Sequence, residues 1–82
     1  MTEAMQTEAV RALLALDAVG GGAPEDVHRH KTRIRFSLLM LERLADADDG
    51  ERYSFAHQIL GAHVRRALDF AASLRDVELA AA

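Results

Sequence analysis

The 82-residue chain contains no cysteine and no tryptophan, and it has only one proline. Without cysteine it can form neither a disulfide nor the Cys₄ or Cys₂His₂ zinc sites that stabilise many small domains. A domain of this size buries only about 60–65% of the surface that its unfolded chain exposes. We therefore expect its stability to come from closely packed helices, from self-association or from a partner.

Long apolar runs and a strong charge imbalance are also missing. Half of the residues are hydrophobic, and 10 basic against 13 acidic residues give a net charge of -3, which is typical of a folded domain. The longest strongly apolar run, residues 38–41, is far shorter than the ~20 residues of a membrane span. Acidic Glu3 stands where a secretory signal would carry basic residues. These features predict a soluble, cytoplasmic protein that does not associate with membranes.

Two breaks divide the chain into three segments with helical periodicity. Glycines at 20–22 followed by Pro24 favour the end of one helix and the start of another. In the second break, Asp48 and Glu51 have the spacing of a capping box. The apolar spacing predicts helices over about 3–19, 24–47 and 51–78. The expected fold is all-α, an antiparallel three-helix bundle in which a long hairpin of the second and third helices is partly covered by a shorter first helix.

The apolar arcs of the two long helices are wider than the first helix can cover. Each spans about half of the helix circumference, compared with the roughly 100° stripe of an ordinary surface helix. In the third helix, Tyr53 is expected in the core stripe and Phe55 on the polar side. Because large exposed apolar patches are uncommon on soluble monomers, the rest of each arc needs a second copy or another protein. The residues expected to form this interface are Ile34, Phe36, Leu39, Met40, Phe55, Phe70 and Leu74.

A small non-catalytic interaction protein, such as an adaptor, a chaperone or a regulatory subunit, is the function that this pattern favours. In outline, a helical hairpin with an acidic turn resembles the small helical chaperones and adaptors of bacterial secretion and flagellar systems. That resemblance concerns size, helix order and acidity, and it assigns no functional residue. The few Ser and Thr residues have no adjacent His and acid, and no Gly-Lys-Ser/Thr follows the glycines. We therefore predict no enzymatic activity and no cofactor.

A local basic cluster supports an alternative function. Four cations alternate along the chain at Arg29, Lys31, Arg33 and Arg35, which raises the possibility of a small nucleic-acid-binding regulator. On a helix, however, they splay to both flanks of the apolar stripe and do not form one row facing phosphates. The hairpin is expected to bring Asp69 and Asp76 roughly alongside them. Together with the acidic net charge, this makes nucleic acid an unfavoured partner.

The four histidines support a second alternative, a metal or pH sensor. They lie at positions 28, 30, 57 and 63, in pairs separated by two and by six residues. A metal site on one helix needs ligands three or four residues apart, so no metal site is predicted. Counted outward from the hairpin turn, His63 lies about one helical turn from His30. The two imidazoles are thus candidates for a pH-sensitive pair or half of a metal site.

Overall fold

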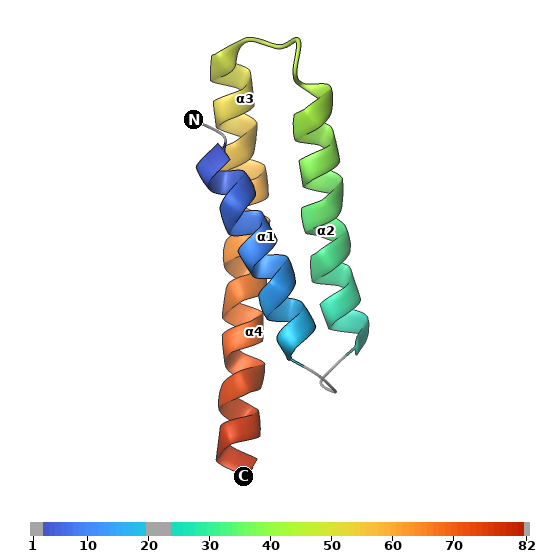
Figure 1. Cartoon of the computed structure of the whole chain (residues 1–82), viewed down its shortest axis with the longest axis vertical. Helices are drawn as coiled ribbons and strands as arrows, with labels where there is room; N and C mark the ends of the chain where they lie inside the picture. The colour runs from blue at the N-terminus through green and yellow to red at the C-terminus, as the bar shows by residue number, and fades with distance from the viewer. Residues whose placement is uncertain (1–2, 20–23, 82) are drawn as a thin grey trace.

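The computed structural model describes residues 3–19 and 24–81, and the side chains of these residues as far as 77 (Figure 1). The elements are α1 (Glu3–Ala18), α2 (Pro24–Arg43), α3 (Asp49–Phe55), the π-helical turn η1 (Ala56–Leu60) and α4 (Gly61–Ala81). Because α3, η1 and α4 follow one another without a break, the described chain forms three rods, as the sequence predicts. We refer to this continuous helix as the third rod. The bundle measures 49 × 19 × 15 Å.

The hairpin turn between α2 and α3 differs from the expected one by a few residues. The Leu44 N–H donates to the carbonyls of both Met40 and Leu41, at 3.1 Å each, so α2 tightens and ends at Arg43, before residue 47. Asp48 is extended (φ -68°, ψ 159°), and its carboxylate accepts a bond from the Glu51 N–H at 2.8 Å. This N-cap confirms the capping role predicted for Asp48 and starts α3 at Asp49. The glycines at 20–22 lie outside the described residues.

Small side chains allow α1 to pack closely against the third rod, which it crosses in Figure 1. Ala9 and Ala12 of α1 and Ala67 and Ala71 of α4 are all buried. Gly61 is buried too, and a Cβ there would lie 3.3 Å from Cε of Met5. Larger side chains fill the rest of the core between the three rods; those fully buried are Leu16, Ile34, Leu41 and Leu60.

The π-helical turn changes which side chains of the third rod face the core. A π-turn inserts one residue into an α-helix, so the residues before it are rotated by about 100° relative to those after it. Tyr53, which the sequence places in the core stripe, is therefore exposed, and its ring lies against that of His57, tilted by 32°, with centroids 4.2 Å apart. Phe55, expected on the polar side, packs against the core instead. Both expectations were wrong because an uninterrupted α-helix was assumed.

Candidate functional site

The second helix has two apolar faces, and only one of them is used by the fold. On the inner face Ile34 and Leu41 are fully buried against α1 and the third rod. Ser37 is also buried there, and its hydroxyl donates to the carbonyl of Arg33 at 2.8 Å, so its polar group is satisfied. The other apolar face points away from the bundle.

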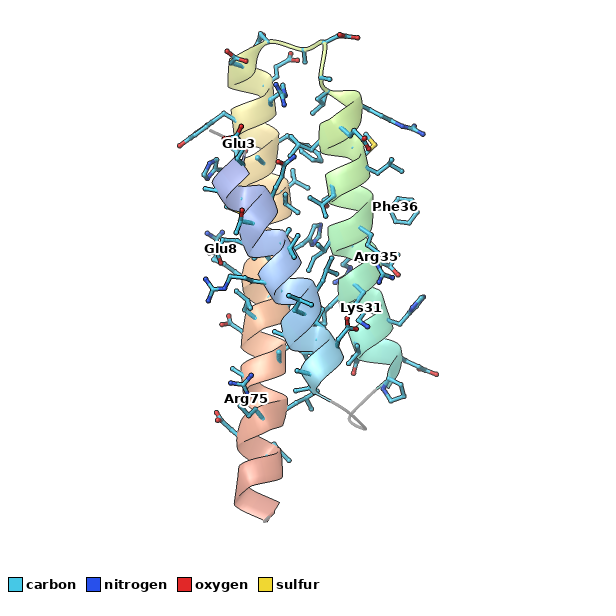
Figure 2. The ribbon with its side chains drawn as sticks, viewed as in Figure 1. Glu3, Glu8, Lys31, Arg35, Phe36 and Arg75 are labelled. Atoms are coloured by element: carbon cyan, nitrogen blue, oxygen red, sulfur yellow. The ribbon has the colours of Figure 1, made fainter. Side chains whose placement is uncertain are left out.

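Three large hydrophobic side chains lie on this outer face. Phe36 is 62% exposed, Leu39 43% and Met40 46%. Figure 2 shows Phe36 projecting from the side of α2, away from the other helices. Thr32 and Arg35 join Phe36 and Leu39 in lining a shallow surface hollow of about 260 Å³. We call the five residues Thr32, Arg35, Phe36, Leu39 and Met40 the α2 outer patch.

The other side chains expected at the interface do not join this patch. Ile34 is fully buried, so its selection as a contact residue was wrong: it cannot reach a partner unless the bundle opens. Phe55, Phe70 and Leu74 are partly buried and pack against the core from the third rod. Phe70 also lies against His30, with ring centroids 4.8 Å apart. Phe36, Leu39 and Met40 are thus the members of the predicted set that share one exposed surface.

Two exposed apolar residues on α1 were missed from the sequence. Val10 is 51% exposed and Leu14 62%, on the side of α1 opposite its buried alanines. They are four residues apart and so lie on the same face of the helix. Their i, i+4 spacing is the sequence signal for a second apolar face. It was overlooked because Ala9, Ala12 and Leu16 belong to a stronger apolar stripe, which is the buried face of the same helix.

The basic cluster is divided among several directions. Arg29 forms an ion pair with Asp26 at 3.1 Å, and Lys31 forms one with Asp17 of α1. Arg35 lies on the α2 outer patch. Among the residues that the structure describes, the ion pairs of the cluster involve Asp26 and Asp17, whereas Asp69 and Asp76 were expected. The four cations therefore do not present one continuous charged row.

His30 of α2 and His63 of α4 are both partly buried, and the charge of His30 is the weakest of the causes that lower the pKa of His63. Burial lowers the pKa of each imidazole below its usual value of 6.5, and the neighbouring Arg33 lowers it further. Arg66 also lowers the pKa of His63, whereas Asp26 acts in the opposite direction on His30. Nδ1 of His63 is buried, and none of the described residues forms a hydrogen bond with it. In the described part of the chain, no group of three or more metal-ligating side chains accompanies the pair.

No family model, no curated protein and no solved structure matches the chain. Within residues 3–19 and 24–81, no helix has the length and apolar character that a membrane crossing requires. What the chain does is therefore inferred from its own surface. Among the described residues, the α2 outer patch brings together three exposed hydrophobic side chains, Phe36, Leu39 and Met40.

Proposed function

We propose that the chain is a small, non-catalytic interaction protein of the cytoplasm, of the adaptor, chaperone or regulatory-subunit kind, whose α2 outer patch docks against a protein. One observation carries the proposal. Phe36, Leu39 and Met40 remain exposed together on a helix whose opposite face already supplies the core. Their burial is not needed to hold the fold, so they are available for a partner.

The size and chemistry of the patch suit protein recognition. Fully burying a large apolar side chain from full exposure yields about 1.5–3 kcal/mol. Because Phe36, Leu39 and Met40 are about half exposed, burying the rest of the three supplies about 2–4 kcal/mol toward association. Aromatic residues, Met and Arg are the residue types enriched at protein interfaces, and the patch combines Phe36, Met40 and Arg35. The flexible Met40 side chain can adapt to the shape of a partner.

The division of the basic cluster favours a protein partner over nucleic acid. Arg29 and Lys31 are paired with carboxylates of the same chain, which reduces the positive charge available for phosphates. Arg35, in contrast, stands beside exposed apolar side chains, where it can pair with a carboxylate at the rim of an interface.

A site-specific photo-crosslinker tests this function. With the crosslinking residue at position 36, irradiation in cells should yield an adduct of defined mass that the Leu39→Asp substitution removes. The matched control places the crosslinker at position 53, because Tyr53 is similarly exposed but lies on the third rod. Equal labelling at both positions, or labelling at 36 that Leu39→Asp leaves unchanged, would show that the patch is not a docking site.

A further inference from the structure

The outer face of α1 carries a stripe with acidic ends. It consists of residues separated by four, three, four and three positions, namely Glu3, Thr7, Val10, Leu14 and Asp17. At about 100° per residue, these five fall within about 80° of arc. Val10 and Leu14 occupy its centre, and every member is exposed. Two cations lie near the stripe: Arg11 is paired with Glu8 at 2.9 Å, and Lys31 of α2 is paired with Asp17 itself.

The outer face of α2 carries a stripe of the same length with basic ends. Its members follow the mirrored spacing of three, four, three and four positions, namely Arg29, Thr32, Phe36, Leu39 and Arg43. They also fall within about 80° of arc, with Phe36 and Leu39 at the centre. Each stripe covers 14 residue steps, which is about 21 Å along a helix. The two stripes thus match in length, in their apolar centres and in the position of their charges.

We propose that the partner of the α2 outer patch is a second copy of this chain, which docks the outer stripe of its α1 along the outer stripe of α2. This inference rests on the function proposed above and specifies its partner. Alternating three- and four-residue spacing is the pattern by which helices pack at small crossing angles in coiled coils.

Charge selects this pairing over the two symmetric ones. Packing α2 against the α2 of another copy would bring Arg29 and Arg43 together, and packing α1 against α1 would bring Glu3 and Asp17 together. Packing α1 against α2 places acidic ends beside basic ends in either helix direction, which favours association. The ion pairs with Lys31 and Asp26 reduce the charge that Asp17 and Arg29 offer, but both side chains stay more than half exposed, at 55% and 56%, so each can still contact an opposite charge on the second copy.

One copy cannot join its own two stripes. The opposite faces of α1 and α2 are buried in the core, as Ala12 and Ile34 show, so both outer stripes point away from the bundle. In Figure 2 Phe36 projects sideways from α2, while α1 lies in front of the third rod. Because the contact joins two different surfaces, each copy has one α1 stripe and one α2 stripe available for binding. The assembly is a two-fold dimer if both contacts form between two copies, and otherwise a ring or an open chain.

A charge-reversal experiment tests the pairing by sedimentation velocity at low salt. The first variant, Arg29→Glu with Arg43→Glu, makes both stripes acidic. The second, Glu3→Lys with Asp17→Lys, makes both stripes basic. Each variant alone should self-associate about tenfold or more weakly than the wild type, because like charges then face each other. An equimolar mixture should regain association, since each variant supplies the stripe that the other lacks.

Two controls distinguish a loss of association from a loss of folding. Circular dichroism has to show wild-type helix content in each variant, because Asp17→Lys removes the ion pair with Lys31. Leu14→Lys gives an independent change on α1, since Leu14 is exposed and outside the ion pairs above. It should weaken association as well.

Three outcomes would overturn the inference. The wild type could stay monomeric at several hundred micromolar, the basic-stripe variant could associate like the wild type, or the mixture could stay dissociated. A monomeric wild type together with a crosslink from position 36 to a different protein would reject the second copy but keep the proposed function. A monomeric wild type that also gives no crosslink from position 36 would reject both the second copy as partner and the proposed function.

Discussion

The two faces of α2 differ far more in solvent exposure than in the hydrophobicity of the side chains that form them. Ile34 and Phe36 are two residues apart and equally apolar, yet Ile34 is 0% and Phe36 62% exposed. The inner face meets α1 and the third rod, whereas nothing within the described chain covers the outer one. The difference separates two roles: inner residues determine whether the bundle folds, and outer residues are free to bind.

The largest expected effect compares the two faces directly. Ile34→Ala should lower the free energy of unfolding by about 2–5 kcal/mol, because it removes buried methylene groups and leaves a cavity. Phe36→Ala should change it by no more than about 0.5 kcal/mol. Urea unfolding followed by circular dichroism at low protein concentration measures both. Similar losses from the two changes would mean that the outer face also supports the fold.

Replacing a small side chain by a larger one tests the same difference between buried and exposed positions. Ser37→Leu forces a large side chain into the buried position between α2 and its neighbours, so we expect a loss of about 1–3 kcal/mol. Ser54→Leu is the matched change at an exposed position of α3. It should stay within about 0.5 kcal/mol of the wild type. A core that accepts Leu at position 37 without loss would be more loosely packed than described.

The turn that joins α2 to the third rod contains the N-cap of α3, Asp48. Asp48→Ala removes the side-chain bond to the Glu51 N–H and should cost about 1 kcal/mol. Asp46→Ala, in the preceding turn, serves as the control for the change in charge and should cost less. Thermal unfolding of the two variants checks the difference, and the cap would be unimportant if they melted together.

We expect acidic pH to lower the stability of the bundle through His30 and His63. Their pKa values are lowered in the fold, mainly by burial, so the unfolded chain binds more protons around pH 6.5. Stability should therefore fall as the pH decreases through 6.5 toward the lowered values, and this contribution should level off below them. Urea unfolding at pH 7.5 and 5.0 measures the loss, which the double change to Gln should reduce. A wild type that is as stable at pH 5.0 as at 7.5 would contradict this assignment.

The bundle could be predicted from the sequence because its signals are local. Pro24, the acidic turn and the helical apolar spacing define the three segments, and Phe36, Leu39 and Met40 were correctly set apart from the main stripe. The π-turn could not be predicted, since residues 56–60 keep ordinary apolar spacing, and this reversed the sides of Tyr53 and Phe55. Ile34 was misassigned because a wide apolar arc does not reveal where the neighbouring helices lie.

The dependence of the melting temperature on protein concentration tests the central claim most directly, because association stabilises only the folded state. Between about 1 and 200 µM, the wild type should melt at rising temperature, whereas Phe36→Asp should melt at one temperature that equals the wild-type value at the lowest concentration. A wild-type melting temperature that does not vary with concentration, or a Phe36→Asp variant that melts lower throughout, would contradict the assignment of the outer face of α2 to binding a second copy.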